Sequence, residues 1–316
     1  MSDPEPVEEN PRAWTADLAL FSVAVMWGIN VPVIKRGVEL IDRLAFNSLR
    51  LTLSAAILGL LVLMERQSKP VENRPWMKIL LVAVITGFVY QLTFVLGVPR
   101  TLAGNTALIL SATPMWTALI AWLIGMDRLP PIAWAGLIVT CAGAGLIAFS
   151  PSTTNLGSEY LMGNLLILGA SLLWAVGSIL TKPLFEYITP TRLAFLSAVV
   201  TLPAHYAVAG STTLDAIQVI RTNPLAFWLV AYSGLFSTGF AYALWNYGVG
   251  KVGPSHASIY QNLVPIVALT SGLFIVDEIP GGVQIPGGIL ILGGLILMRR
   301  GRRGSHQLSR LKPNES

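Results

Sequence analysis

Charged side chains are scarce in this chain, and their scarcity excludes an ordinary water-soluble domain. Asp, Glu, Lys and Arg make up 12% of the 316 residues, whereas hydrophobic residues make up 53%. Soluble domains carry about 25% charged residues. The single cysteine, Cys141, excludes an intramolecular disulfide, and no Cys/His cluster has the spacing of a metal site. The sequence therefore predicts no metal and no other cofactor.

Catalytic motifs are also missing from the chain. It contains no H-E-x-x-H, no G-x-S-x-G and no paired carboxylates within an apolar stretch. All 16 acidic residues lie outside the long apolar stretches or at their ends. Transporters that exchange hydrophobic cations for protons usually bury a carboxylate, so its absence favours a zwitterion moved by facilitated diffusion or exchange. We expect a protein that is not an enzyme.

What the chain does contain is ten apolar segments, each near the roughly 20 residues that a helix needs to cross a bilayer. They cover residues 17–34, 44–64, 79–98, 106–125, 132–149, 161–180, 193–208, 225–247, 258–276 and 283–298. The linkers between them are short. The sequence predicts an all-α integral membrane protein with ten transmembrane helices and no separate soluble domain.

The last five segments resemble the first five at offsets of 147 to 151 residues. Matching pairs include Trp27 with Trp174, Lys35 with Lys182, Pro114 with Pro265, and Gly143 with Gly294. Because each unit has an odd number of segments, the second unit must lie upside down relative to the first. The sequence therefore predicts a five-helix repeat at 15–150 and an inverted five-helix repeat at 151–300 around a central cavity. Inverted repeats are typical of secondary transporters, in which two halves open the cavity to each side in turn.

Basic residues predict which side of the membrane holds the termini. With ten spans both termini share a side, and that side collects fifteen Lys and Arg against five on the other. The positive-inside rule assigns the basic-rich side to the cytoplasm. We therefore expect a cytoplasmic N-terminal tail at 1–14 and a basic cytoplasmic C-terminal tail at 301–316. The tail arginines account for the net charge of +5, so we do not expect binding to nucleic acid.

Short patterns within the segments are those of a known family. They are Trp27-Gly28-Ile29-Asn30 with Lys35, the stretch from Trp174 to Lys182, and Ala-rich fourth and ninth segments that end in Asp127 and Glu278. Over about residues 15–300 the chain resembles the EamA-type transporters of the drug/metabolite transporter superfamily. Within that family it is similar to the YddG-type amino-acid exporters of bacterial inner membranes.

The resemblance implies export of aromatic and other neutral amino acids and related small metabolites by a secondary transporter. With the inverted repeat, it predicts transport by alternating access. It also implies a basket of helices around the cavity, with the fifth and tenth helices packed apart from it. The expected location is a bacterial-type inner (plasma) membrane, and the expected partners are a small-molecule substrate and the lipid bilayer. Glycines at helical spacing predict packing seams or a dimer surface, so monomer and homodimer both stay open.

Polar and aromatic side chains within the segments are the candidate cavity residues, because polar groups in lipid need a partner or a wet cavity. Aromatic faces bind an apolar body or an ammonium group, and amides can satisfy a carboxylate. Many of these residues lie three or four positions apart, on one helix face. The predicted substrate-binding residues are Trp27, Asn30, Tyr90, Gln91, Phe94, Trp174, Ser178, Tyr242, Trp245, Asn246, His256, Tyr260 and Gln261.

Other interpretations of these residues stay open. The aromatic pairs are also compatible with packing, and His256 with an ordinary place at the start of a helix. Pro32, Pro114 and Pro265 interrupt the helical hydrogen bonds within their segments, which predicts kinks or hinges. Bending for packing alone is the alternative.

Basic residues raise a second substrate class. Lys35, Arg50 and Lys182 could approach the cavity and bind phosphate, so an antiporter of phosphorylated or nucleotide-linked sugars is the alternative function. Lys35 and Lys182 lie at segment ends, where snorkelling to the interface explains them. Arg50 lies about two turns into its segment and is harder to explain this way. A proton-coupled multidrug exporter is the remaining alternative.

Overall fold

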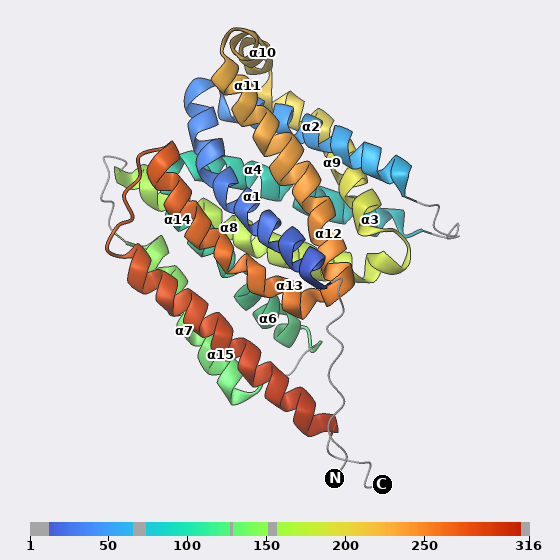
Figure 1. The fold of residues 1–316 in the computed structure, drawn as a ribbon, viewed down its shortest axis with the longest axis vertical. Coiled ribbons are helices and arrows are strands. Elements are labelled where there is room, and N and C mark those ends of the chain that lie inside the picture. Colours follow the sequence, from blue (N-terminus) through green and yellow to red (C-terminus); the bar gives the residue numbers. More distant parts are fainter. Residues whose placement is uncertain (1–12, 66–73, 127–128, 151–156, 311–316) are drawn as a thin grey trace.

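The computed structural model describes residues 13–65, 74–126, 129–150 and 157–310, and every regular element in these ranges is a helix (Figure 1). Eight of the described stretches are long and apolar enough to cross a membrane, and a ninth, Ile259–Ile275, is apolar but shorter. The all-α class is confirmed. The tenth predicted segment lies in the long helix α15 (Gln284–Arg310), whose apolar run ends at Arg299.

The elements of the first half are α1 (Ala13–Leu40), α2 (Arg43–Met64), α3 (Trp76–Val82), η1 (Ala83–Val89), α4 (Tyr90–Gly97), η2 (Val98–Arg100), α5 (Ala103–Ser111), α6 (Thr113–Leu123) and α7 (Pro131–Ala148). Those of the second half are α8 (Gly157–Thr181), η3 (Lys182–Glu186), α9 (Pro190–Ala209), α10 (Thr212–Thr222), α11 (Pro224–Ala231), η4 (Tyr232–Phe240), α12 (Ala241–Val252), α13 (Pro254–Gln261), α14 (Leu263–Ile275) and α15. Each predicted segment falls on one helix or on a run of consecutive helices.

Local sequence signals set several helix ends. The Asp42 carboxylate accepts hydrogen bonds from the backbone N–H groups of Leu44 (2.9 Å) and Ala45 (3.1 Å), which caps the start of α2. Asn223 caps α11 in the same way. Gly253 ends α12 with a φ of 81°, which residues with a side chain rarely adopt. These signals set helix boundaries near the boundaries of the apolar segments.

Four helical rods are interrupted, in two matching pairs. The π-helical elements η1 and η4 lie within the third and eighth predicted segments. The α5–α6 rod breaks at Ala112, shortly before Pro114, and the α13–α14 rod breaks at Asn262, shortly before Pro265. Each proline removes a backbone donor from its helix. Helix α1, in contrast, continues through Pro32.

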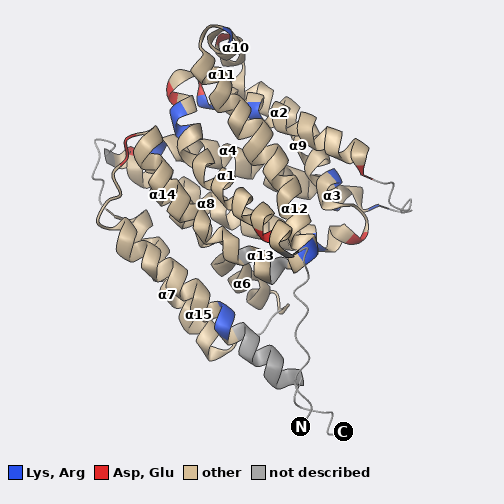
Figure 2. Ribbon diagram, in the orientation of Figure 1, with Lys and Arg blue, Asp and Glu red and all other residues tan. Residues whose placement is uncertain are grey.

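The helices run between two ends of the bundle, which we call face A and face B. Helix α1 begins at face A, where the Thr15 hydroxyl lies 2.9 Å from that of Tyr247 in α12. Helix α2 begins at face B and ends at face A, where Glu65 accepts a hydrogen bond from Thr189 (2.8 Å) at the start of α9. The charged residues gather mainly at these two ends (Figure 2).

Two pairs of helices at matching positions in the two halves pack antiparallel, and α2 with α9 is the first pair. Glu65 at the end of α2 forms an ion pair with Arg192 (3.2 Å) near the start of α9. Asp42, just before α2, accepts a hydrogen bond from Thr212 (3.2 Å), which follows the end of α9. The two helices therefore run in opposite directions past each other.

Helices α7 and α15 form a second antiparallel pair at the edge of the bundle (Figure 1). Their glycines face one another. A Cβ atom added at Gly143 would lie 2.8 Å from the carbonyl oxygen of Gly287 and from the backbone nitrogen of Ile291, and one added at Gly294 would lie 2.6 Å from the carbonyl oxygen of Gly136. Such small residues let two membrane helices approach closely. The glycine pattern thus predicts this seam correctly.

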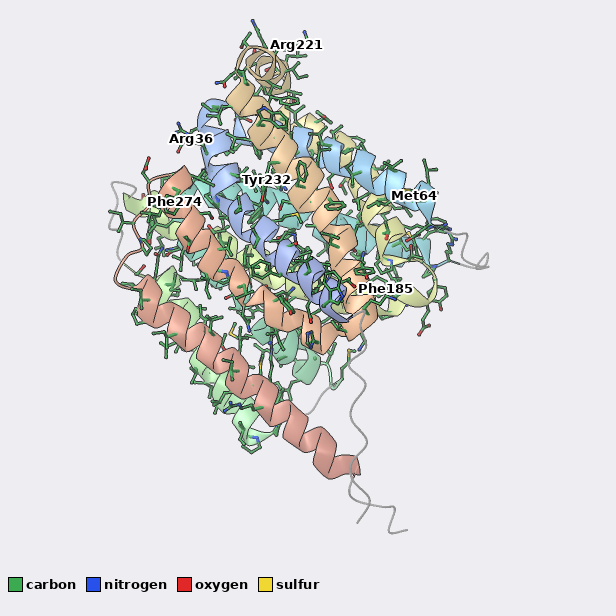
Figure 3. The ribbon with its side chains drawn as sticks, in the orientation of Figure 1. Arg36, Met64, Phe185, Arg221, Tyr232 and Phe274 are labelled. Atoms are coloured by element: carbon green, nitrogen blue, oxygen red, sulfur yellow. The ribbon has the colours of Figure 1, made fainter. Side chains whose placement is uncertain are left out.

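Large apolar side chains cover the outside of the bundle. Leu63 of α2 is 84% exposed and Phe274 of α14 is 78% exposed, and Met64 and Phe274 lie on the outer surface in Figure 3. A continuous apolar exterior is unfavourable in water, but it is the surface that lipid contacts. The bundle is therefore built for a membrane.

The α7–α15 seam makes a stability prediction. Gly143→Ala should lower the free energy of unfolding by about 1–3 kcal/mol, because its methyl group meets backbone atoms that cannot rotate away. Gly145→Ala, on the same helix with nothing within 4 Å of its Cβ position, should change it by less than about 1 kcal/mol. Thermal unfolding of both variants in detergent tests this difference. Equal midpoints would show that α7 and α15 are not held at this distance.

Candidate functional site

A cavity of about 460 Å³ lies between helices of both halves. Volumes of this order are typical of small-molecule sites. Its walls are contributed by α1, α2, α4, α5, α6, α8, η4, α12, α13, α14 and α15. Nine of the predicted substrate-binding residues line it: Trp27, Asn30, Tyr90, Gln91, Phe94, Trp174, Ser178, Tyr242 and Gln261.

Four predicted site residues lie outside this lining. Trp245 packs behind Trp27, with ring centroids 5.4 Å apart. His256 lies near face A, where its Nε2 is 2.8 Å from the Asp17 carboxylate, and the Tyr260 ring lies 6.0 Å from the His256 ring. The last of the four is Asn246, on α12. Of the predicted kink residues Pro114 lines the cavity, whereas Pro32 and Pro265 do not.

Aromatic rings form one wall of the cavity. The Tyr90 ring lies 4.9 Å from the Trp174 ring and 5.9 Å from the Phe94 ring, measured between centroids. Two further lining rings are held by hydrogen bonds to backbone carbonyl oxygens. Trp27 Nε1 on α1 donates to the Ser237 oxygen (3.0 Å), and the Tyr242 hydroxyl on α12 donates to the Pro190 oxygen (3.2 Å). These bonds hold the rings in place, and their faces offer apolar and cation-binding surface.

A guanidinium group belongs to the same wall. Arg50 is 2% exposed, and it donates to Asn47 Oδ1 from Nε (3.0 Å) and from Nη2 (2.8 Å). Nη2 also donates to Gln91 Oε1 (2.6 Å), and Nη1 donates to Thr238 Oγ1 at 3.3 Å. No ion pair to Arg50 occurs among the described residues.

The Asn47 amide is held by a second polar link. His205 Nε2 lies 2.8 Å from the Gly87 carbonyl oxygen, which can only accept, so this nitrogen carries the proton. His205 Nδ1 then accepts from the Asn47 amide nitrogen at 3.2 Å. The Asn47 oxygen is thereby turned toward Arg50. Neither Asn47 nor His205 stands out in the sequence, because their partners lie on helices far apart in the chain.

Hydroxyl groups complete the lining and also carry no sequence signal. Ser111, Thr113, Thr117, Ser237 and Thr238 all face the cavity. Hydroxyls within membrane helices often bond to their own backbone, as those of Ser48, Thr93 and Thr117 do. Lining and non-lining hydroxyls therefore look alike in the sequence. Asn262, at the α13–α14 break, and Arg299, where the apolar run of α15 ends, line the cavity as well.

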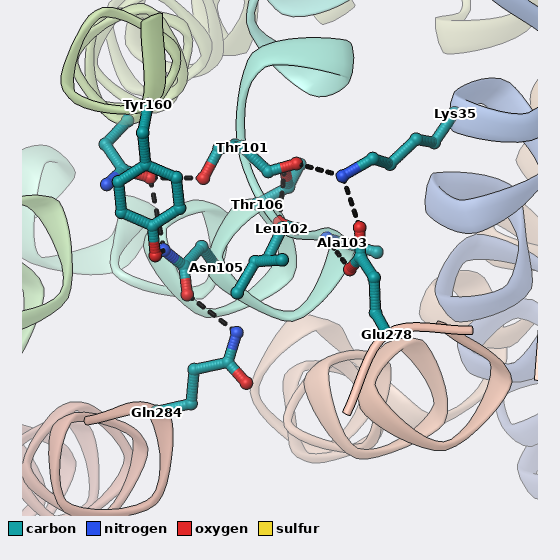
Figure 4. Close-up of polar contacts among 10 residues, drawn as sticks. Lys35, Thr101, Leu102, Ala103, Asn105, Thr106, Tyr160, Glu278 and Gln284 are labelled. Carbon is teal, nitrogen blue, oxygen red and sulfur yellow. Dashed lines mark hydrogen bonds and ion pairs between the residues drawn. The ribbon is translucent and has the colours of Figure 1, made fainter. Parts of the chain in front are cut away.

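Toward face B, the helices are joined by a polar cluster (Figure 4). Lys35, one turn beyond the lining residue Val31, forms an ion pair with Glu278 and donates to the Thr101 carbonyl oxygen at 2.5 Å. Glu278 also accepts from the Ala103 backbone N–H (2.6 Å). The cluster ties α1 to the start of α5 and to the segment after α14.

Amide groups extend this cluster across to α8 and α15. Asn105 donates to the Tyr160 hydroxyl (2.7 Å), and its oxygen accepts from Gln284 (2.8 Å). Asn164 donates to the Ala148 carbonyl oxygen at the end of α7 (3.1 Å). Face B is thus bridged by satisfied polar contacts, whereas the lining extends to Arg299 near face A. In the described ranges, no three His, Cys, Asp or Glu side chains form a group that could hold a metal ion.

Comparison with known proteins places these features in a family. The model of the EamA-like transporter family matches residues 14–149 and 161–300, once in each half of the chain. The uncharacterized transporter YoaV of Bacillus subtilis is 24% identical over 268 residues, which cover 83% of this chain and 88% of its own. The uncharacterized inner membrane transporter YedA of Escherichia coli K12 is 29% identical over 263 residues, 80% of each chain.

A solved structure supports the fold. A crystal structure described only as that of a protein superposes with a TM-score of 0.53 over 92% of this chain and 98% of its own, at 17% sequence identity. The relatives above are named as transporters, and their names give no substrate.

The Lys35–Glu278 pair makes a second stability prediction. Glu278→Gln leaves the Lys35 ammonium without its counter-ion. The Lys35 side chain is only 14% exposed, so water cannot fully replace the lost carboxylate. We expect a loss of up to about 3 kcal/mol, the lower end for buried pairs. Thermal unfolding in detergent should show that adding Lys35→Met restores part of this loss. Glu39→Gln, in the exposed Arg36–Glu39 pair, is the control and should have little effect. Additive effects of the two substitutions would show that Lys35 and Glu278 are not coupled.

Proposed function

The chain belongs to the EamA-like transporter family, and from that premise we propose that it is a secondary transporter that exports neutral amino acids, aromatic ones included, by alternating access. The observation that carries this proposal is the cavity between the two halves. Its aromatic rings, amides and single deeply buried guanidinium suit a molecule with an apolar body and a small charged head. The proposed location is an inner (plasma) membrane, because the relative YedA is named as an inner membrane transporter.

The proposed inverted repeat is supported by the packing of matching helices. Two five-helix units of opposite orientation place matching helices antiparallel, as α2 lies against α9 and α7 against α15. The start of α5 likewise lies against the end of α14, through the contact of Ala103 with Glu278. Matching interruptions at Ala112 and Asn262 give the two units the same internal form.

The closure of one end supports the proposal of alternating access. The polar cluster at Lys35 and Glu278 bridges face B, and the cavity lining reaches toward face A, the predicted cytoplasmic side. In this reading substrate enters from face A, and export requires the cluster to part while face A closes. Pro114 and Pro265, which lie beside the helix breaks, are the proposed hinges, and Pro32 is a proposed kink within α1.

A phosphorylated or nucleotide-linked sugar is the second candidate substrate, because Arg50 and Arg299 both line the cavity. Two cations suit a phosphate better than one. Proton-coupled export of drug cations has less support, since no Asp or Glu occurs in the lining formed by the described residues. The proposed assembly is a monomer or a homodimer.

Transport in proteoliposomes tests the proposed substrate class. Vesicles loaded with unlabelled tryptophan should accumulate radiolabelled tryptophan and threonine by exchange, and should not accumulate labelled glucose 6-phosphate. Because no carboxylate for proton exchange lines the cavity, the exchange should persist with a protonophore present. Empty liposomes give the background. Uptake of the sugar phosphate without uptake of amino acids would replace the proposed substrate with the second candidate.

The aromatic wall makes a further prediction. Trp174→Ala removes a lining ring that lies 4.9 Å from Tyr90, and should lower kcat/KM for tryptophan exchange about tenfold, which corresponds to about 1.4 kcal/mol. Trp228→Ala, on the outer surface with 63% exposure, should leave exchange unchanged and controls for the loss of a tryptophan. Equal rates for both variants would remove Trp174 from the site.

A further inference from the structure

We infer that Arg50 is the anchor for a carboxylate group of the substrate, so that the transporter selects molecules with a free carboxylate over their amides and amines. The inference rests on the proposed function, since it names how an amino acid would be recognised in the same cavity. It starts from the charges of the lining. Arg50 and Arg299 are the charged residues of the lining in the described part of the chain, and Arg50 is the one placed deep in the bundle, at 2% exposure.

The charge of Arg50 is not neutralised by the protein around it. Its hydrogen-bond acceptors are the amide oxygens of Asn47 and Gln91 and the hydroxyl of Thr238, all of them neutral. Among the described residues no carboxylate lies within 4.0 Å of it. A cation within the membrane is unfavourable unless an anion or water accompanies it. An anionic group that enters the cavity gains from this charge.

The orientation of the guanidinium supports a ligand-binding role. Asn47, which occupies Nε and one hydrogen of Nη2, is not a lining residue, so this edge is turned away from the cavity. Gln91 and Thr238, which accept from Nη2 and Nη1, do line the cavity. The bond from Nη1 to Thr238 is long, at 3.3 Å, and Nη1 has a second hydrogen. The Nη1 side is therefore where an incoming carboxylate can bind.

The guanidinium is also held rigidly in this orientation. The chain of contacts from Gly87 through His205 to Asn47 fixes the amide that grips Nε and Nη2. A planar donor fixed in advance presents its remaining Nη1 hydrogen to a carboxylate without the cost of ordering a flexible side chain. A lysine at this position has no such plane, which makes Arg50→Lys an informative variant.

A second group in the lining suits the other pole of an amino acid. The Oδ1 atom of Asn30 is buried and has no hydrogen-bond partner among the described residues, and Asn30 is 8% exposed. A buried acceptor without a donor is costly, so a ligand N–H that reaches it is favoured. With the carboxylate on Arg50, an ammonium group can donate to Asn30 while the side chain packs against Tyr90 and Trp174.

The test measures selectivity rather than activity alone. Inhibition of tryptophan exchange by unlabelled tryptophan, tryptophanamide and tryptamine is measured for wild type, Arg50→Gln and Arg50→Lys. In wild type, tryptophan should inhibit at a concentration at least tenfold lower than tryptophanamide does. In Arg50→Gln, the inhibitory concentrations of the two ligands should lie within about twofold of each other. Arg50→Lys should keep part of the preference for tryptophan, since lysine retains the positive charge but lacks the planar guanidinium group.

A second variant guards against loss of folding in Arg50→Gln. Gln91→Glu keeps the size of the residue that accepts from Nη2 at 2.6 Å and supplies an internal carboxylate. This variant should raise the thermal stability of the protein. Inhibition by tryptophan should require an about tenfold higher concentration, whereas inhibition by tryptamine should stay the same or improve. Two results would show that Arg50 has only a structural role and that the inference is wrong. In the first, Gln91→Glu and Arg50→Gln weaken inhibition by all three ligands by the same factor. In the second, they leave the preference for tryptophan over tryptophanamide intact.

Direct binding separates this inference from the proposed function. Thermal stabilisation of the detergent-solubilised protein is measured with indole-3-propionate and with its amide. If wild type exchanges no amino acid but is stabilised by the acid alone, and Arg50→Gln abolishes that effect, the anchor stands and the amino-acid substrate is wrong. If wild type exchanges tryptophan but binds acid and amide alike, the exporter stands and the anchor is wrong.

Discussion

Hydrocarbon offers no hydrogen bonds, so every polar group within a membrane bundle must find a partner in the protein or a space that holds water. In this chain, polar groups within the bundle occur in three kinds of environment. Some pair across helices, as Asn47 does with His205. Some meet at an end of the bundle, as Lys35 and Glu278 do at face B. Others line the central cavity, and their presence there is what distinguishes the cavity from a packing defect.

The same requirement explains how the helices can be interrupted. Pro114 cannot donate to the Leu110 carbonyl oxygen, and the Thr113 hydroxyl donates to that oxygen instead, at 2.7 Å. Thr113, Pro114 and Asn262 all lie in the lining, so both breaks border the cavity. A helix that breaks beside a wet space needs few compensating contacts, and a break of this kind can bend with little loss. The cavity and the proposed hinges are therefore parts of one arrangement.

Hydropathy alone predicts the all-helical class and the position of each apolar segment, because lipid contact demands long apolar runs. Residue spacing predicts which side chains share a helix face, and it finds Trp27, Asn30 and Tyr90 in the lining. Spacing does not predict depth, so His256 is found near face A and Trp245 behind another ring. The links of Arg50 could not be predicted, because Thr238 lies 188 residues further along the chain. Asp127, matched to Glu278 in the sequence repeat, lies outside the described residues.

Two cations within the bundle show how their surroundings divide their roles. Lys35 has a carboxylate and a carbonyl oxygen as partners, so its charge is balanced inside the protein and serves to join helices. Arg50 has three neutral acceptors, so its orientation is fixed while its charge remains. Only the second arrangement leaves an electrostatic demand that a ligand can meet. A transporter must release its substrate as well as bind it, so the attraction between this charge and the substrate has to be modest. A single guanidinium already shared among amides and a hydroxyl meets that condition, because its hydrogen bonds to the protein persist when the substrate leaves.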